Sequence, residues 1–252
     1  AYSSEFAAVF GGDVFDDVER AYAAVTMALA QYQREDAEFA AFSSKYDAYL
    51  AGRAQLTEQE ARGLALFEDE AKGNCAACHP SRPADGQPPL FTDFTYDALG
   101  VPRNPELQQN ADPAFYDFGL CARDDGVLAS RDDLCGLFKV PSLRNVALRK
   151  RYFHNGRFAS LRDVVDFYVT RDTEPARWYP TVDGAVAKFD DLPARFHGNV
   201  NTSEPPYDRR PGDAPALTPG EIDDVVAFLR TLTDDWSPGS GHASVRVSSR
   251  SA

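Results

Sequence analysis

The sequence has few of the residues and segments on which many protein classes depend. Methionine occurs once among the 252 residues, as Met27, and cysteine and histidine occur four times each. No apolar run approaches the roughly 20 residues that a membrane-spanning helix needs, so we expect no membrane span. The first residues also lack a basic segment followed by an apolar one, which indicates a mature or truncated chain rather than one that starts with a signal peptide.

Positive charge is scarce as well. The 26 Lys and Arg residues are outnumbered by 39 Asp and Glu residues, and the formal net charge is −13. Phosphate backbones and anionic membrane surfaces repel such a chain, which argues against a nucleic-acid partner. A basic protein partner is compatible with this charge, but an acidic solvated surface explains it equally well. Hydrophobic residues make up 43% of the chain, so we expect it to fold.

The first 50 residues are expected to be helical. One face is apolar at alternating spacings of three and four, the helical repeat. Its members are Phe15, Val18, Tyr22, Val25, Leu29 and Tyr32. The opposite face is also apolar, with Ala23, Ala24, Met27 and Ala30. A helix that is apolar all round has to be covered on both sides, so either the chain starts inside a domain or a partner covers this helix.

Three further helices begin at recognisable capping residues. Thr57-Glu58-Gln59-Glu60 opens a helix expected to run to Lys72-Gly73, Ser160 opens one over 161–171, and Thr218-Pro219-Gly220-Glu221 opens the last. Residues 80–135 and 172–216 are rich in Pro, Asp, Gly and Asn and are expected to be irregular. Since no run alternates like a strand, the predicted fold class is mainly α with long irregular loops. The Ser/Gly-rich segment 237–252 is expected to be a flexible tail.

Cys75-Ala76-Ala77-Cys78-His79 is the strongest motif in the chain. Two thiols at this spacing reach the two vinyl groups of one porphyrin, and the following histidine ligates the iron. The motif therefore predicts one covalently bound haem c. A structural zinc site of Cys75, Cys78, Cys121 and Cys135 is the main alternative. It would leave His79 without a role, and a Cys75–Cys78 disulfide is favoured still less.

Cys121 and Cys135 are expected to form a disulfide. Haem c is attached on the oxidising side of bacterial membranes, where disulfides persist, so the motif also predicts a periplasmic location. Two free buried thiols are the alternative.

The second axial ligand of the iron is open on sequence grounds alone. Met27 lies in the early helix, which leaves His154, His197, His242 and Tyr168 as candidates. We interpret His154 as a buried, hydrogen-bonded histidine beside the haem. The helical period places Tyr168 on the inward face of its helix, where a core tyrosine is the simplest interpretation.

Four stretches resemble the bacterial di-haem cytochrome c peroxidase and MauG family. They are Leu64-Ala65-Leu66-Phe67 before the CxxCH motif, residues 138–146 (FKVPSLRNV), residues 152–158 (YFHNGRF), and the closing segment 226–232 (VAFLRTL). The resemblance covers about residues 50–235. It implies a cytochrome c-like haem domain over 51–236, corresponding to the family's C-terminal haem domain, with 1–50 as the helical remnant of a first-haem domain.

The resemblance also implies residue roles. Tyr168 lies 14 residues after His154, where peroxidases of the family carry a Met ligand and MauG-type members a tyrosine ligand. His79 and Tyr168 would then be the axial ligands. A tyrosinate oxygen would favour ferric iron. Arg144 and Arg157 could pair with the haem propionates, or could brace loops instead. Trp178 and Trp236 could lie on an electron path, or could be packing anchors.

Two departures from the family pattern bear on function. The sequence has one CxxCH motif where the family has two, so a second haem is expected on a missing segment or on a partner polypeptide, unless the chain is a one-haem variant. The family often shows Thr-Ala-Pro-Tyr where this chain has Arg149, Lys150 and Arg151 before Tyr152. Three cations repel calcium, so the calcium ion that the family binds there is not expected.

The predicted function is electron transfer in peroxide-dependent oxidation, together with an electron-donor or acceptor protein. The alternative is a mono-haem electron-transfer cytochrome without peroxidase activity.

Overall fold

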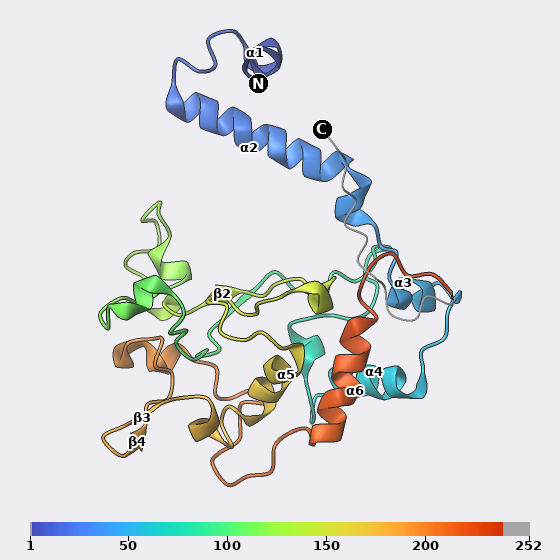
Figure 1. The fold of residues 1–252 in the computed structure, drawn as a ribbon, viewed down its shortest axis with the longest axis vertical. Helices are drawn as coiled ribbons and strands as arrows, with labels where there is room; N and C mark the ends of the chain where they lie inside the picture. Colours follow the sequence, from blue (N-terminus) through green and yellow to red (C-terminus); the bar gives the residue numbers. More distant parts are fainter. Residues whose placement is uncertain (1, 239–252) are drawn as a thin grey trace. The chain divides into compact units, whose positions relative to one another are not determined.

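The computed structural model describes residues 2–238 (Figure 1). The chain divides into two compact units, one ending at Phe42 and the other beginning at Ser43. Within the described residues no helix combines the length and the hydropathy that crossing a membrane requires.

The first unit contains the early helix that the sequence predicts. It consists of α1 (Ser3–Phe10), α2 (Val18–Glu35) and the 3₁₀ helix η1 (Ala37–Ala40). α2 begins at Val18, because the Asp17 side chain accepts a hydrogen bond from the backbone N–H of Arg20 at 2.7 Å and caps the first turn. Val18 and Tyr22 are 80% and 67% exposed, and Ala24 is the one buried residue of α2. Both apolar faces of the helix are thus largely exposed.

The second unit begins at Ser43, whereas the sequence predicted a boundary at residue 51. The short helix α3 (Lys45–Leu50) belongs to it, because the backbone N–H of Tyr46 donates to the carbonyl of Thr231 at 3.1 Å. Asp47 also forms a buried ion pair with Arg144, with a nitrogen–oxygen distance of 2.8 Å. These contacts join residues 43–50 to the second unit, at Arg144 and Thr231.

Three longer helices frame the second unit: α4 (Glu58–Glu68), α5 (Leu161–Thr170) and α6 (Pro219–Arg230). Thr57 and Thr218 form the predicted capping boxes, and the Ser160 side chain caps α5. The predicted end of α4 at Lys72-Gly73 is wrong, because Asp69 has extended backbone angles and ends the helix.

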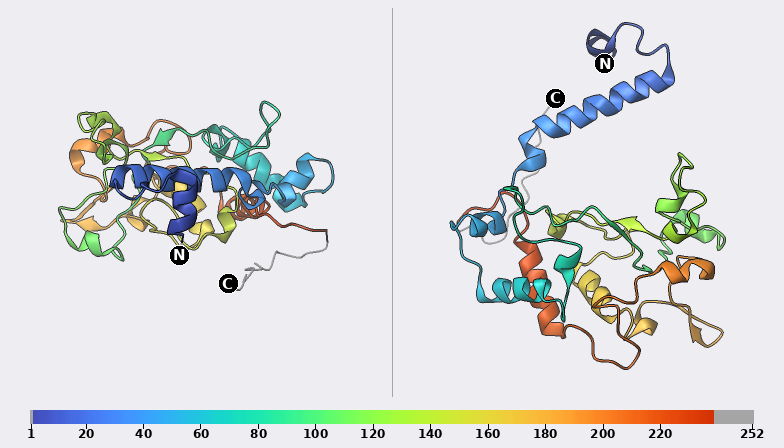
Figure 2. Two further views of the ribbon diagram at one scale, coloured as in Figure 1. Left: turned by 90° about the horizontal axis from the view of Figure 1, so that it is seen from above. Right: turned by 180° about the vertical axis from the view of Figure 1, so that it is seen from behind.

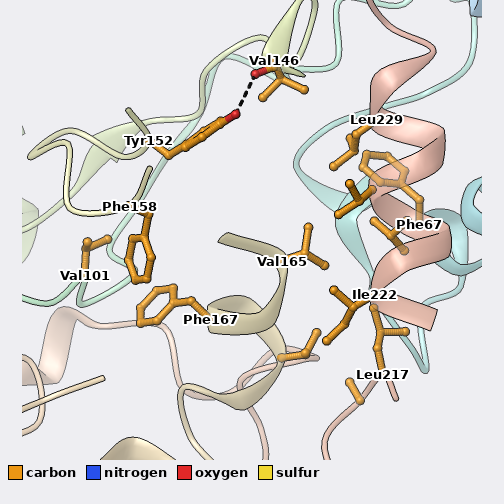
Figure 3. Packing of buried hydrophobic residues seen from close by; sticks show 14 of the residues in the cluster. Phe67, Val101, Val146, Tyr152, Phe158, Val165, Phe167, Leu217, Ile222 and Leu229 are labelled. Atoms are coloured by element: carbon orange, nitrogen blue, oxygen red, sulfur yellow. Dashed lines mark hydrogen bonds between the residues drawn. The ribbon is translucent and has the colours of Figure 1, made fainter. Parts of the chain in front are cut away.

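α4 and α6 lie side by side in Figures 1 and 2. Gly63 makes this close approach possible, since a Cβ atom there would lie 2.0 Å from the backbone oxygen of Asp224. The core continues from α6 to α5, where Val165 faces Ile222 and Leu229 (Figure 3). Phe158 and Phe167 extend it further, with ring centroids 5.2 Å apart.

Sheet structure is confined to two short antiparallel pairs. β1 (Tyr96–Asp97) pairs with β2 (Phe138–Lys139), and β3 (Thr181–Val182) pairs with β4 (Ala185–Val186). The remaining elements are short 3₁₀ helices: η2 (Cys75–Ala77), η3 (Gln108–Ala111), η4 (Leu120–Ala122), η5 (Asp132–Leu134), η6 (Val146–Leu148), η7 (Pro175–Arg177) and η8 (Ala194–Asn199). The predicted mainly α fold with long irregular loops is confirmed.

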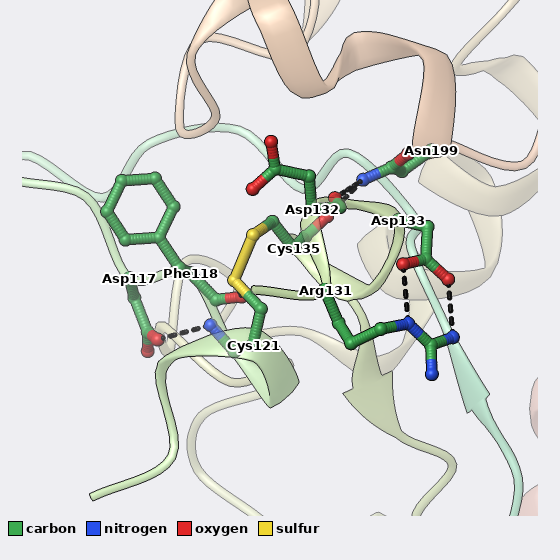
Figure 4. Close-up of a disulfide and its surroundings, with 9 residues drawn as sticks. Asp117, Phe118, Cys121, Arg131, Asp132, Asp133, Cys135 and Asn199 are labelled. Atoms are coloured by element: carbon green, nitrogen blue, oxygen red, sulfur yellow. Dashed lines mark hydrogen bonds and ion pairs between the residues drawn. A yellow bond between two sulfur atoms is a disulfide. The ribbon is translucent and has the colours of Figure 1, made fainter. Parts of the chain in front are cut away.

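Cys121 and Cys135 are joined in a disulfide with an S–S distance of 2.07 Å (Figure 4). The side chain of Asn199 donates hydrogen bonds to the carbonyls of Asp132 and Cys135 at 2.7 and 2.9 Å. The cross-linked loop is therefore attached to η8, which otherwise lies far from it in the sequence.

Candidate functional site

The CxxCH motif lies in a tight turn that follows α4. Gly73 fits beneath the carbonyl of Leu66, which would lie 2.7 Å from a Cβ atom at this position. Asn74 has left-handed backbone angles, with φ of 48°, and its side chain donates to the carbonyl of Pro205 at 2.9 Å. The backbone N–H of His79 then donates to the carbonyl of Cys75 at 2.9 Å. This turn places both thiols and the imidazole in the wall of one cavity.

The cavity has a volume of about 570 Å³, within the range of small-molecule and cofactor pockets. It lies between the CxxCH turn, α5, α6 and the segment 138–154. Most of its wall is apolar, including Phe67, Phe138, Phe153, Val165, Leu217 and Leu229. The cysteine, histidine and tyrosine side chains in this wall are those of Cys75, Cys78, His79, Tyr152, His154, Tyr168 and Tyr207. The structure thus brings together the motif and two of the candidate second ligands, His154 and Tyr168.

His79 is oriented by the backbone. Its Nδ1 lies 2.8 Å from the carbonyl oxygen of Phe91. A proton on Nδ1 satisfies this contact and leaves the lone pair of the ring on Nε2, the arrangement that metal-binding histidines require. Burial lowers the pKa of His79, an effect that the Phe91 and Pro141 carbonyls and Asp93 oppose. The imidazole is therefore neutral at pH 7.

Both thiols of the motif are held in the neutral form. Burial raises the pKa of Cys75 to about 12. It also raises the pKa of Cys78 to about 11, with further contributions from the negative charges of Asp97, Asp93 and Glu204. Asp97 and Glu204 line the cavity too, so the thiol end of the cavity carries negative charge.

Tyr168 lies on α5 and is half-buried, and it lines the cavity. Its ring centroid is 5.6 Å from that of Phe153 and 6.1 Å from that of Tyr207. Burial raises its pKa well above the usual range for tyrosine, and the nearby thiol of Cys75 and carboxylate of Asp97 act in the same direction. The hydroxyl is therefore protonated at neutral pH in the absence of a metal.

Tyr207 is a cavity residue that the sequence did not reveal. It stands in the Pro-rich stretch 172–216, where no periodicity marks an inward position. The guanidinium of the fully buried Arg171 lies 4.3 Å from its ring centroid. Arg171 itself donates to the carbonyls of Leu99 and Asn201 at 2.8 and 2.6 Å. This network holds the wall of the cavity next to Tyr168.

His154 lines the cavity and also contacts the side chains of Phe138 and Asp191. Its ring stacks on Phe138 with centroids 3.5 Å apart. Burial lowers its pKa to about 4, against a smaller opposing effect of Asp117. His154 is thus neutral at pH 7, and its 3.9 Å approach to Asp191 is not an ion pair there.

Arg144 and Arg157, which the sequence offered as partners of the haem propionates, do not line the cavity that residues 2–238 form. Arg144 donates two hydrogen bonds to the carboxylate of Asp47, at 2.8 and 3.0 Å, and a third to the carbonyl of Pro89. Arg157 has its guanidinium 6.0 Å from the ring centroid of Phe158, and its Nε is buried without a hydrogen-bond partner among the described residues. Asp47 binds the guanidinium of Arg144, as the loop-bracing alternative expects, and a pairing of Arg144 with the haem stays a prediction.

The other candidates do not contribute to the cavity as described by residues 2–238. Nε2 of His197 lies 2.8 Å from the carbonyl of Leu192, and Met27 belongs to the first unit. His242 lies outside the described residues. Trp178 donates to Thr170 at 3.0 Å and packs on Phe167, and Trp236 donates through its backbone to Ser43.

The zinc alternative is wrong, because Cys121 and Cys135 are oxidised to a disulfide. The described part of the chain contains no cluster of three or more His, Cys, Asp or Glu side chains placed to hold a metal ion. The residues of the cavity do suit a haem: a large apolar wall, two unpaired thiols at the required spacing, and an imidazole with its Nδ1 engaged.

Comparisons with known proteins agree with this interpretation. No protein-family model matches the chain. It is 36% identical over 246 residues to the methylamine utilization protein MauG of Paracoccus denitrificans (strain Pd 1222), covering 93% of this chain and 57% of the relative. It is 34% identical over 186 residues to the cytochrome-c peroxidase IdrP1 of Denitromonas iodatirespirans, covering 66% of this chain and 45% of the relative. The chain thus spans about half the length of these relatives.

A solved structure is more similar still. The diheme peroxidase BthA from Burkholderia thailandensis E264 superimposes with a TM-score of 0.84 at 45% identity, covering 95% of this chain and 59% of that chain. The fold and the cavity define a cytochrome c-like domain of the di-haem peroxidase type. The chain belongs to the bacterial di-haem cytochrome c peroxidase and MauG family.

Proposed function

We propose that this chain is the electron-transferring haem half of a periplasmic di-haem peroxidase of the cytochrome c peroxidase and MauG type. The observation that carries the proposal is that Cys75, Cys78, His79 and Tyr168 line one cavity of about 570 Å³. The relatives are named as peroxidases or as MauG, and the similar solved structure is titled a diheme peroxidase.

Haem c supplies a one-electron iron couple when it is bound. Cys75 and Cys78 tether it by thioether bonds, and Nε2 of His79 binds the iron while the Phe91 carbonyl fixes the orientation of the ring. The Tyr168 oxygen is the second ligand in this proposal. It has to lose its proton to bind, which only a cation in the cavity can favour against the raised pKa.

Tyr168 determines the reduction potential of the site and therefore the reaction for which the site is suited. An anionic oxygen donor favours the oxidised metal and lowers the reduction potential relative to a thioether donor. A site of this kind suits the storage of oxidising equivalents. His154 is the runner-up ligand because it lines the same cavity and is neutral at pH 7, although its ring stacks on Phe138.

The periplasmic location is supported by the chemistry of the cysteines. The Cys121–Cys135 disulfide and the thioether bonds proposed for Cys75 and Cys78 both call for an oxidising compartment. An electron-donor protein would deliver electrons to this site, and a polypeptide segment with the second haem would receive them.

The second candidate function is a mono-haem electron-transfer cytochrome without peroxidase activity. It is favoured by the single CxxCH motif of the sequence. The two functions share the haem site described above, and they differ in whether a peroxide-reacting haem is present in the complex.

The haem itself is tested by intact mass and a pyridine haemochrome assay on protein made with a haem c attachment system. We expect one covalent haem per chain, and loss of the covalent link when both Cys75 and Cys78 are replaced by alanine. A colourless protein with the mass of the bare polypeptide would end the proposal.

The Tyr168 ligand is tested separately by resonance Raman and near-infrared spectra of the ferric protein. Tyr168→Phe should abolish a tyrosinate-to-iron band and raise the reduction potential. Tyr207→Phe is the matched control, since it removes a hydroxyl from the same cavity 6.1 Å away between ring centroids. A spectrum that follows His154→Gln instead of Tyr168→Phe would show bis-histidine ligation.

A further inference from the structure

The cavity wall contains cations that neither the motif nor the family resemblance assigned. Among the described lining residues these are Lys139, Arg149 and Arg151. All three come from the segment 138–151 and are exposed at its surface. A local group of positive charges is notable in a chain with a net charge of −13.

These cations are weakly engaged by the protein. Arg149 makes no side-chain hydrogen bond or ion pair with any residue of the described range. Nζ of Lys139 lies 4.6 Å from the ring centroid of Phe94, and it forms no ion pair with a carboxylate of residues 2–238. Arg151 pairs with Glu106 at 2.7 Å, but both side chains are more than half exposed, and such a pair contributes little to stability.

The opposite charges lie at the thiol end of the cavity. Asp97 and Glu204 line the cavity and act on the thiol of Cys78. All four carboxylates that the described residues contribute to the wall accept hydrogen bonds within the protein, and Asp97 and Glu204 accept theirs from the side chain of Asn201 at 3.2 and 2.8 Å. Asp117 accepts from the backbone of Gly119 at 3.0 Å, and Asp191 accepts from the side chain of Asn155 at 2.9 Å. Lys139 belongs to the same thiol end, because β2 pairs with β1 and sets Phe138 opposite Asp97 and Lys139 opposite Tyr96. The cations of the described wall that remain for another ligand are Arg149 and Arg151.

A haem has its own polarity, which matches this distribution. Its two carboxylates lie on the edge of the porphyrin opposite the two vinyl groups. If the vinyl groups are bonded to Cys75 and Cys78, the carboxylates point away from Asp97 and Glu204. Burying them requires cations or hydrogen-bond donors at the far edge.

We propose that Arg149 and Arg151 hold the two carboxylates of the haem, in the role that the sequence gave to Arg144 and Arg157. The inference rests on the proposed function, because it requires haem in this cavity. Arg149 is the central residue, since its guanidinium has no competing partner. Arg151 exchanges Glu106 for a haem carboxylate. The fixed positive charges raise the reduction potential and oppose the effect of the Tyr168 oxygen.

The experiment measures the reduction potential and the resonance Raman carboxylate bending modes of the holoprotein. Arg149→Gln should lower the equilibrium constant for reduction roughly tenfold, which is about 59 mV for one electron, and should shift a carboxylate mode. Arg149→Lys keeps the charge and should restore most of the potential. Lys150→Gln is the matched control, because it removes the same charge from the adjacent residue, which is exposed and outside the described cavity wall.

Each possible result either supports or contradicts the proposed binding of the haem carboxylates. A change with Arg149→Gln that Lys150→Gln does not reproduce supports the proposal. Equal shifts in the two variants, with unchanged carboxylate modes, would reduce the effect to surface charge and overturn it. Modes that respond to Arg157→Gln and not to Arg149→Gln would place the carboxylates at Arg157 and also overturn it. In all of these cases the haemochrome assay still reports one haem, whereas a chain that does not bind haem in this cavity at all gives none, and that result contradicts the haem assignment on which both candidate functions depend.

Discussion

His154, whose side chain is 17% exposed, shows how a single partly enclosed side chain makes stability depend on pH. Burial lowers its pKa from an ordinary 6.5 to about 4, so the folded protein takes up the proton later than the unfolded chain as the pH falls. The unfolded chain binds more protons between these values, and the free energy of unfolding therefore falls as the pH falls through this window. The contribution of His154 to the free energy of unfolding is complete above pH 6.5. It falls by roughly 3 kcal/mol once the pH is below about 4.

The prediction is tested by urea unfolding of the holoprotein at pH 7 and pH 5. The wild type should lose about 2 kcal/mol more than His154→Gln between these two pH values. Comparing the two proteins removes the effect of buried carboxylates such as Asp191, whose pKa burial raises and whose contribution has the opposite sign. Equal pH dependence in the two proteins would show that His154 is accessible to solvent.

At the scale of the elements, the close approach of α4 and α6 depends on Gly63. A methyl group there would lie 2.0 Å from the backbone oxygen of Asp224 and 2.9 Å from Cβ of Phe228, so the helices would have to move apart. Gly63→Ala should cost roughly 1–3 kcal/mol of unfolding free energy, as overpacked cores do. Gly220→Ala, in α6 with no atom near the added methyl group, should be neutral or stabilise by up to about 1 kcal/mol. Denaturant midpoints of the two variants measure the contrast, which a shared loss of stability would contradict.

Sequence patterns located the starts of the helices and the haem motif, but not the contacts that connect distant loops. Thr57, Ser160 and Thr218 cap the helices that follow them, because a cap is a local interaction over three residues. The end of α4 was misplaced, since Gly73 turned out to serve a close backbone contact rather than a C-cap. The ion pair of Arg144 could not be predicted, because its partner, Asp47, lies 97 residues away in the sequence.

The same limit applies to the cavity wall. Cys75, Cys78 and His79 were recognisable because haem attachment imposes a fixed spacing. Tyr207 and Arg149 come from irregular segments and Lys139 from a strand of two residues, and in none of these does a period indicate the inward side. The charge of Arg149 was noted in the sequence for its effect on calcium, and only the structure places it at the cavity.

At the scale of the whole molecule, the chain spans roughly half of its relatives and has one CxxCH motif, so the reaction with peroxide is expected to need a haem that this sequence does not encode. In the proposed ligation His79 and Tyr168 occupy both axial positions of the iron, which leaves no open position for peroxide. Mixing the reduced chain with hydrogen peroxide in a stopped-flow instrument should therefore change the Soret band slowly. Tyr168→Ala should accelerate the change by roughly an order of magnitude or more, while Tyr207→Phe should not. A fast change in the unaltered chain would mean that peroxide reacts at this site directly, and that no second haem is required.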